Sequence, residues 1–212
     1  MAEINLGIIG GGQLGSMLSV AAKKLNIKTI IYCDDKDAPA QNFCDEFIFG
    51  SYKDKEKIIE FVNKVNVVTF EFENIPYQTL SEINKIKTVL PKPSINRIIQ
   101  HRLAEKDFIN KLNIRTTRYA SIEKRSDLNT LEDLLPGILK TTTMGYDGKG
   151  QYPVKKITDL NSLNIDFSKG YILEKLVRLK KEISVIITRF GNNRYEIYEP
   201  IENSHEDQIL KH

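Results

Sequence analysis

The stretch NLGIIGGGQLGSMLSVAAKKLNIKTIIY, residues 5–32, decides the fold of the N-terminal part of the chain. A short apolar run, Asn5–Ile9, stops at three consecutive glycines, and a helical pattern follows over residues 13–25. The apolar positions of that pattern are Leu14, Met17, Leu18, Ala21 and Leu25. A second apolar run covers residues 28–32. The order strand, glycine turn, helix, strand is a βαβ signature, so we predict a parallel sheet.

Further elements are predicted on both sides of a junction at Lys92-Pro93. Before it we expect strands at Glu46–Phe49, Val67–Phe70 and 88–90, and helices at 54–63 and 76–83. After it we expect helices at 94–100 and 102–112, then strands at Tyr119–Ile122, 137–142, Gln151–Val154, 171–174, 182–188 and 194–198. The sequence therefore predicts an α/β domain, a small α+β domain and the start of another sheet.

Composition narrows the class of protein. The chain has 212 residues, 41% hydrophobic and 28% charged, as is ordinary for a soluble globular protein. The net charge of +3 is too small and too scattered to indicate nucleic-acid binding. The two cysteines form no Cys-x-x-Cys pair, and the three histidines lie far apart, which argues against a disulfide framework and a zinc site. With no membrane-length apolar run and no signal-peptide pattern, we expect a cytoplasmic protein.

The first candidate site is Gly10-x-Gly12-x-x-Gly15, between the first strand and the first helix. It matches the dinucleotide fingerprint, and Asp34 or Asp35 supplies an acidic residue at about the expected offset. Glycine amides at a helix N-terminus bind phosphate, whether from NAD or from a phosphorylated substrate. A tight strand-to-helix turn without a ligand is the alternative.

A second candidate site lies in VVTFEFENIP, residues 67–76. A buried strand delivers Glu71, Glu73 and Asn74 to the edge where open α/β sheets bind ligands. Alternation along the strand would place the two glutamates on the same side. A solvated strand end is the alternative.

The third candidate site is LKTTTMGYDGKGQ, residues 139–151. Its charges are Lys140, Asp147 and Lys149. Oriented glycine amides beside lysines form a phosphate cradle, although the spacing is not that of the P-loop. The same residues are good turn chemistry, so a surface hairpin is the alternative.

Two weaker patterns complete the set. Arg102 and Lys106 lie on one face of a helix, although a salt-bridged surface helix has the same spacing. Glu174 and Glu182 are single carboxylates on apolar strands, where they could hold the hydroxyls and amines of a nucleotide.

Taken in order, seven segments resemble the N5-carboxyaminoimidazole ribonucleotide synthetase family of the ATP-grasp superfamily. They are GIIGGGQLGSM, VTFEFENIP, HRLAEKDF, ILKTTTMGYDGKGQ, ILEKLV, KEISVI and YEPIENSH, between residues 7 and 205. The resemblance implies a Rossmann-like pre-ATP-grasp domain over residues 1–95 and a small ATP-grasp subdomain with linker helices over 96–178. Residues 179–212 would begin a second ATP-grasp subdomain, left incomplete.

The resemblance also assigns roles to residues. It implies ATP binding by Arg102, Lys106, Lys140, Gly145, Gly148, Gly150, Gln151, Glu174, Lys175, Val177 and Glu182. It implies catalysis by Lys140, Tyr146, Asp147, Lys149 and His205, and substrate binding by Gly12, Gln13, Leu14, Glu73 and Asn74. Arg102 and Lys140 would contact the ATP phosphates. Glu174, with the backbone after it, would read the adenine, and Glu182 would hold the ribose.

The implied activity is the ATP-dependent carboxylation of 5-aminoimidazole ribonucleotide with bicarbonate, through carboxyphosphate, in purine biosynthesis. The implied cofactors are ATP and Mg²⁺, with the metal ligands expected in a C-terminal portion that follows in family members. The resemblance also implies a homodimer with neither nucleic-acid nor membrane partners. Two alternatives stay open: a truncated remnant that only binds ligand, and an NAD-type oxidoreductase built on the first glycine loop.

Overall fold

The structure is a computed structural model that describes residues 4–145, 150–163, 165–191, 193–206 and 209–210. Contacts divide the chain into two units, residues 1–108 and 109–212, and each unit is described by itself. The finer division at residues 95 and 178 stays a prediction.

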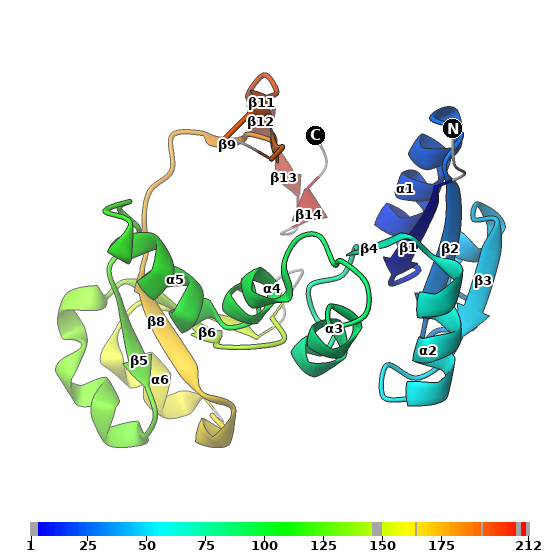
Figure 1. The fold of residues 1–212 in the computed structure, drawn as a ribbon. Helices are drawn as coiled ribbons and strands as arrows, with labels where there is room; N and C mark the ends of the chain where they lie inside the picture. Colours follow the sequence, from blue (N-terminus) through cyan, green and yellow to red (C-terminus); the bar gives the residue numbers. More distant parts are fainter. Residues whose placement is uncertain (1–3, 146–149, 164, 192, 207–208, 211–212) are drawn as a thin grey trace. The chain divides into compact units, whose positions relative to one another are not determined.

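The first unit is built on a four-stranded parallel sheet (Figure 1). Its strands are β1 (Asn5–Ile9), β2 (Lys28–Cys33), β3 (Glu46–Phe49) and β4 (Val67–Phe70), in the order β3-β2-β1-β4. Its helices are α1 (Gln13–Lys24), the 3-10 helix η1 (Pro39–Asn42), α2 (Lys55–Lys64), α3 (Tyr77–Ile83), α4 (Pro93–Ile99) and α5 (Arg102–Lys111), which continues into the second unit. The predicted parallel sheet is confirmed, with β1 between β2 and β4.

The strand predicted at residues 88–90 is wrong. The structure has only a single parallel bridge there, between Val68 and Val89. Pro91 follows at once and has no N–H with which to extend a ladder.

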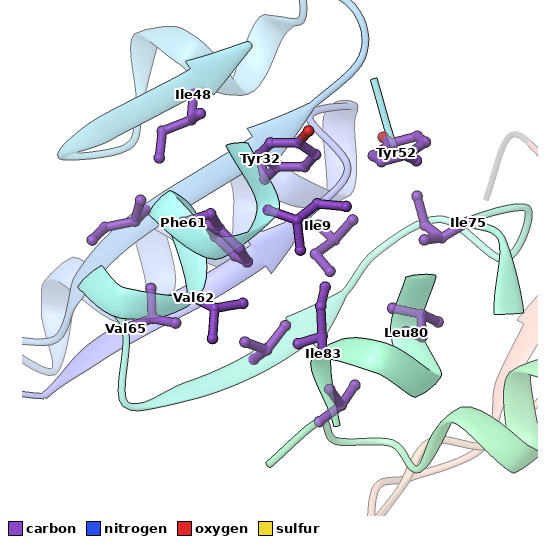
Figure 2. Close-up of a cluster of buried hydrophobic side chains, with 14 residues drawn as sticks. Ile9, Tyr32, Ile48, Tyr52, Phe61, Val62, Val65, Ile75, Leu80 and Ile83 are labelled. Atoms are coloured by element: carbon purple, nitrogen blue, oxygen red, sulfur yellow. The ribbon is translucent and has the colours of Figure 1, made fainter. Parts of the chain in front are cut away.

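The main core of this unit lies between one face of the sheet and α2 and α3 (Figure 2). Phe61 of α2 is fully buried, and its ring centroid lies 5.6 Å from that of Tyr32 on β2. Gly7 of β1 lies beneath it, and a Cβ at Gly7 would come within 2.7 Å of the Phe61 ring. The glycine therefore lets the aromatic ring reach the sheet. On the opposite face Ile8 and Ile31 pack with the residues around η1, so both faces of the sheet are covered.

Helix α1 forms where the spacing of its apolar residues predicts a helix, but the residues that it buries are mostly small ones outside that apolar set. Its buried positions are Gly15, Ser16, Ser19 and Ala22. Leu14 and Met17 are instead 56% and 61% exposed. The Ser16 and Ser19 hydroxyls donate to the carbonyls four residues earlier, so these polar groups are satisfied inside the helix. A small-residue face lets the helix approach the sheet closely.

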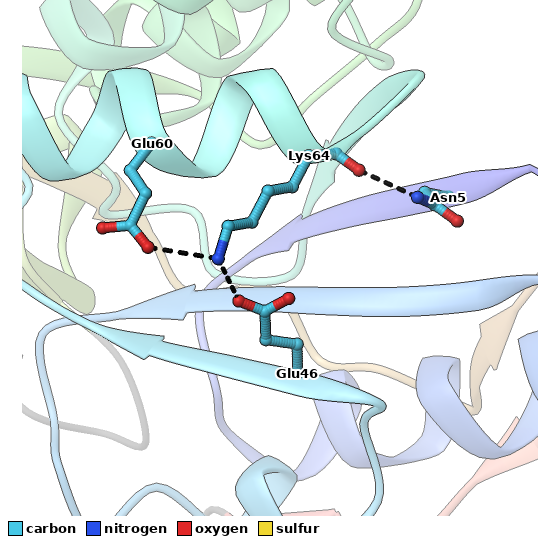
Figure 3. Close-up of polar contacts among 4 residues, drawn as sticks. All are labelled: Asn5, Glu46, Glu60 and Lys64. Carbon is cyan, nitrogen blue, oxygen red and sulfur yellow. Dashed lines mark hydrogen bonds and ion pairs between the residues drawn. The ribbon is translucent and has the colours of Figure 1, made fainter.

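Polar contacts join the end of α2 to the start of β1 and β3 (Figure 3). The Lys64 ammonium pairs with the carboxylates of Glu46 and Glu60, and the Asn5 side chain donates to the Lys64 carbonyl at 2.9 Å. The Lys64 ammonium donates hydrogen bonds to both carboxylates, and these bonds raise its pKa, the bond to Glu46 more than the bond to Glu60. These contacts fix the edge of the sheet opposite to its carboxyl ends.

Asp54 caps the N-terminus of α2, where its side chain accepts a hydrogen bond from the Lys57 amide at 3.1 Å. We expect Asp54→Ala to lower the free energy of unfolding by about 1 kcal/mol, because an orphan helix N–H loses its acceptor. Asp54→Asn keeps an acceptor and should cost much less. Urea denaturation followed by circular dichroism checks this, and equal losses for the two variants would contradict the capping role.

The second unit holds a four-stranded antiparallel sheet in the order β5-β8-β6-β7. Its strands are β5 (Tyr119–Ile122), β6 (Gly137–Thr141), β7 (Gln151–Val154) and β8 (Tyr171–Lys175). The short helices around it are η2 (Arg125–Thr130), η3 (Glu132–Leu134), α6 (Ile157–Ser162) and η4 (Phe167–Lys169). Leu139, Leu160 and Leu173 lie in its core and are fully buried, so α6 helps to cover the sheet.

The remaining strands pair in three short ladders. They are β9 (Glu182–Ser184) with β12 (Ile201–Asn203), β10 (Ile187–Arg189) with β11 (Tyr195–Ile197), and β13 (His205–Glu206) with β14 (Ile209–Leu210). The single strand predicted over 182–188 is therefore wrong: β9 and β10 pair with different partners. Described side chains between 176 and 204 are exposed, except for partly buried Ser184 and Asn203.

Candidate functional site

The first candidate region lies at the carboxyl ends of β1 and β4. Gly12 is the N-cap residue of α1 and has no side chain with which to cap the helix. Its amide instead donates to Oε1 of Glu71 at 2.9 Å. The Glu71 amide donates to the Ile9 carbonyl at 3.1 Å, which fixes Glu71 beside the glycine loop.

The glycine loop borders a cavity of about 240 Å³. The cavity is lined by Gly10, Gly11, Gly12, Cys33, Asp34, Asp35, Ala38, Pro39, Tyr52, Glu71 and Phe72. Sequence reasoning named the glycines and the acidic residues but missed Cys33 and Tyr52. The position of Cys33 at the end of β2 was a usable signal, because ligands bind outside the carboxyl ends of such strands. Tyr52 follows β3 in a loop and gave no such signal.

Tyr52 is buried, and its hydroxyl donates to the Cys33 sulfur at 3.8 Å. Burial, together with the nearby Cys33 and Asp34, raises the pKa of the Tyr52 hydroxyl. Burial, with Asp54 and Asp34, raises the pKa of Tyr32 to about 12. Both phenols therefore stay protonated at neutral pH, and neither can serve there as a base.

The residues predicted to bind the substrate lie in two segments, the first turn of α1 and the turn after β4. Gln13 and Leu14 are exposed in the first turn of α1. Glu73 and Asn74 lie in the turn after β4, where the Asn74 amide donates to the Glu73 carboxylate at 3.3 Å. Strand β4 ends before Glu71, so the alternation expected for Glu71 and Glu73 does not extend to them.

The second candidate region lies on the sheet of the second unit. The Lys140 ammonium on β6 lies 2.9 Å from the Glu174 carboxylate on the neighbouring strand β8. The two side chains are only 17% and 10% exposed. In the register of the sheet Lys140 lies opposite Ile172, with Gln151 of β7 on its other side. Two residues that the sequence named separately therefore form one buried ion pair.

The loop between β6 and β7 is closed at its base. The Thr141 amide donates to the Gly150 carbonyl at 2.9 Å. Gly150 has a φ of +69°, and a Cβ there would lie 2.6 Å from the Thr141 hydroxyl oxygen, so this position needs glycine. Strands β6 and β7 pair antiparallel on either side of this loop, so it connects a hairpin, while phosphate binding by the loop stays a prediction. Gly145 is described, whereas Tyr146, Asp147, Gly148 and Lys149 lie outside the described residues.

The other ATP-side residues of β8 and beyond have partners of their own. The Lys175 ammonium donates to the Asp133 carbonyl at 2.7 Å. Its amide donates to the Arg118 carbonyl at 2.9 Å, and its carbonyl accepts from the Thr117 hydroxyl at 2.7 Å. The backbone expected to read adenine is thus already hydrogen-bonded at Lys175, while Val177 is exposed.

Four further residues named from the sequence lie elsewhere in the chain. Glu182 begins β9, and its carboxylate accepts from the Asn203 side chain at 3.2 Å. Arg102 and Lys106 are partly buried and lie one turn apart on α5, as their spacing predicts. His205 lies in β13, and its side chain lies outside the described residues.

Among the residues that the structure describes, no three His, Cys, Asp or Glu side chains gather closely enough to hold a metal ion. None of the helices in that part of the chain combines the length and the apolar character needed to cross a bilayer.

Comparison with known families agrees with this two-unit organisation. Residues 1–100 match the ribonucleotide synthetase pre-ATP-grasp domain, and residues 107–212 match the ATP-grasp domain. The chain therefore belongs to the ATP-grasp family, and its predicted α/β fold with a pre-ATP-grasp domain is confirmed.

Within that family, several similar relatives are named N5-carboxyaminoimidazole ribonucleotide synthase. The N5-carboxyaminoimidazole ribonucleotide synthase of Staphylococcus aureus strain COL is 32% identical over 208 residues, which are 97% of this chain and 56% of that protein. Its Brucella melitensis counterpart is 34% identical over 210 residues, 97% of this chain and 58% of that protein. The resemblance that the sequence motifs indicate is confirmed.

Solved structures agree with this placement. The Staphylococcus aureus N5-carboxyaminoimidazole synthetase in complex with ADP superposes with a TM-score of 0.91 at 31% identity, over 99% of this chain and 57% of that one. The Aspergillus clavatus enzyme with ADP and aminoimidazole ribonucleotide gives 0.84 at 25% identity, over 99% of this chain and 56% of that one. The chain thus spans little more than half the length of these bacterial and fungal relatives.

Proposed function

We propose that this chain takes part in the ATP-dependent carboxylation of 5-aminoimidazole ribonucleotide to its N5-carboxy derivative. The observation that carries the proposal is the buried Lys140–Glu174 pair on the sheet of the ATP-grasp unit. The relatives named for this activity, and the neighbour structures holding ADP, support it.

The Lys140 ammonium is suited to bind a nucleotide phosphate. It is held on a central strand among buried residues, where charge interactions are stronger than in water. A phosphate oxygen arriving at Lys140 can replace the Glu174 carboxylate as its anionic partner. The carboxylate would then be available to accept a hydrogen bond from an exocyclic amine such as that of adenine.

The proposed reaction has two steps, a phosphoryl transfer to bicarbonate and a carboxyl transfer to the amine. A bicarbonate oxygen attacks the γ-phosphorus of ATP, the bond to the bridging oxygen breaks, and ADP leaves with that electron pair. The exocyclic amine of aminoimidazole ribonucleotide then attacks the carboxyl carbon of carboxyphosphate, releasing phosphate and one proton. Lys140 would stabilise the phosphoryl charge, since phosphoryl transfer depends mainly on positioning and neutralised charge.

The other roles assigned from the family motifs extend this proposal. Gln13, Leu14, Glu73 and Asn74 would contact the ribonucleotide, and Arg102 and Lys106 the nucleotide phosphates. Mg²⁺ belongs to the proposal as the partner of ATP, but the described residues form no cluster that fits it, so no step is derived through it. The bicarbonate substrate, a homodimer and the two finer domain boundaries are proposed on the same family grounds.

A second candidate function is nucleotide binding without turnover. It is supported by the Lys140–Glu174 pair, which could bind a nucleotide phosphate, and by the neighbour structures that hold ADP.

Titration of the full chain with ADP and ATP, followed by ADP release in the presence of bicarbonate, separates these functions. We expect Lys140→Met to weaken nucleotide binding about 10- to 100-fold, the value of one hydrogen bond to a charged group. Lys155→Met is the matched control, because Lys155 is an exposed lysine after β7. ADP release that depends on aminoimidazole ribonucleotide supports carboxylation. Nucleotide binding without ADP release supports the second function, and equal affinities for both variants would overturn the role of Lys140.

A further inference from the structure

We infer that Glu71 is a specificity-determining residue of the glycine loop: its carboxylate occupies the position that a dinucleotide phosphate would need. The inference rests on the geometry of the first unit and is independent of the proposed carboxylation. It explains why a sequence that matches the dinucleotide fingerprint belongs to a different family.

All three fingerprint glycines face the Glu71 side chain. A Cβ at Gly10 would lie 2.5 Å from Oε1 of Glu71, and a Cβ at Gly12 would lie 3.2 Å from the same atom. A Cβ at Gly15 would lie 3.6 Å from Cγ of Glu71 and 3.2 Å from the Gly10 carbonyl. Gly10 has a φ of +102°, which side chains rarely adopt. In this loop, therefore, the missing side chains make room for a carboxylate of the chain itself.

The carboxylate also takes the hydrogen bond that a phosphate would accept. In a dinucleotide-binding loop the amides at the helix N-terminus donate to the pyrophosphate. Here the Gly12 amide at the start of α1 donates to Oε1 of Glu71. The Glu71 carboxylate is attracted to the positive end of the α1 dipole, as a bound phosphate would be.

Two further carboxylates make the cavity beside the loop unfavourable for a pyrophosphate. Asp34 and Asp35 line the same cavity as the loop and Glu71. A pyrophosphate in this cavity would meet the three carboxylates of Glu71, Asp34 and Asp35.

The test uses the full chain and two substitutions of Glu71. Glu71→Gln keeps an oxygen that can accept from the Gly12 amide but removes the negative charge, and Glu71→Ala removes both. We expect inorganic pyrophosphate and NAD to bind each variant at least about tenfold more tightly than the wild type. Both variants lose the carboxylate charge that repels an anion, and Glu71→Ala also leaves the Gly12 amide available to the ligand. Isothermal titration calorimetry measures both ligands.

Asp37→Asn is the matched control, because it removes an exposed carboxylate outside the cavity lining. It should leave the pyrophosphate affinity at the wild-type value. The inference is overturned if folded Glu71→Gln binds pyrophosphate no more tightly than the wild type, or if the wild type itself binds NAD as tightly as the variants.

A measurement on the wild type keeps the inference testable if both substitutions impair folding. We expect the Gly12 amide to exchange with solvent deuterium slowly, because it is hydrogen-bonded to Glu71. Exchange at the rate of an exposed loop amide would contradict the proposed contact, whatever the variants do.

Discussion

Phe61→Ala is expected to destabilise the first unit by about 3–5 kcal/mol, a large part of the stability of an ordinary domain. Phe61 is fully buried and packs on the Tyr32 ring (Figure 2). It also lies over Gly7 of β1. Truncation removes its apolar contacts and leaves a cavity that the flat sheet face below cannot refill. Hydrogen exchange at the β1 and β2 amides measures the loss locally.

Phe43→Ala is the matched control for this experiment. Phe43 has the same chemistry but is 49% exposed, so its truncation should change the free energy of unfolding by no more than about 0.5 kcal/mol. Equal losses for Phe61→Ala and Phe43→Ala would contradict the packing described here.

Glu174→Leu is expected to cost the second unit about 3 kcal/mol, because it leaves the Lys140 ammonium in a largely buried place without its carboxylate. The double variant Lys140→Met with Glu174→Leu replaces both charges by apolar groups and should recover much of that loss. We expect a coupling energy of about 1–3 kcal/mol between the two positions. Urea denaturation of the four chains of this cycle gives the value.

An exposed pair serves as the comparison. Lys181 and Glu202 lie 2.7 Å apart, but both side chains are 59% exposed. The same cycle there should give about 0–1 kcal/mol. A Lys140–Glu174 coupling no larger than this would show that the pair is not stabilised by its burial.

Strands could be predicted from the sequence where their signals are local. The apolar runs that form β1, β3 and β4 are each followed at once by a glycine or a charged residue, so period and length were enough. The division of residues 182–188 into β9 and β10 could not be predicted, because it depends on the partners β12 and β11 further along the chain. The strand predicted at residues 88–90 is wrong for a similar reason. A suitable apolar run does not guarantee a ladder with a neighbouring strand, and only one bridge forms at Val89.

The buried face of α1 could not be inferred from hydrophobicity. The spacing of Leu14, Met17 and Leu18 predicts a helix, but the sheet takes the face with Gly15 and Ser19. Close approach to the sheet favours small residues there, and that preference depends on the neighbouring elements as much as on the helix.

The sequence allowed the residues of the candidate sites to be named, but it did not show which of them contact one another. Lys140 and Glu174 were named for different parts of a nucleotide, yet their contact depends on β6 lying beside β8. Glu71 was named with Glu73, yet it turns onto a loop 59 residues earlier in the sequence. Strand order and register bring such residues together, and neither can be read from a local pattern.

The position of β4 in the sheet has a consequence for how the glycine loop acquires its shape. β4 lies at the end of the order β3-β2-β1-β4, and it carries the residue before Glu71. The strand, turn and helix around Gly12 can form early from local contacts, whereas Glu71 arrives only when a strand some sixty residues later has docked. Any local unfolding that releases β4 must also release the Gly12 amide. The loop therefore reports on whether β4 has docked beside β1.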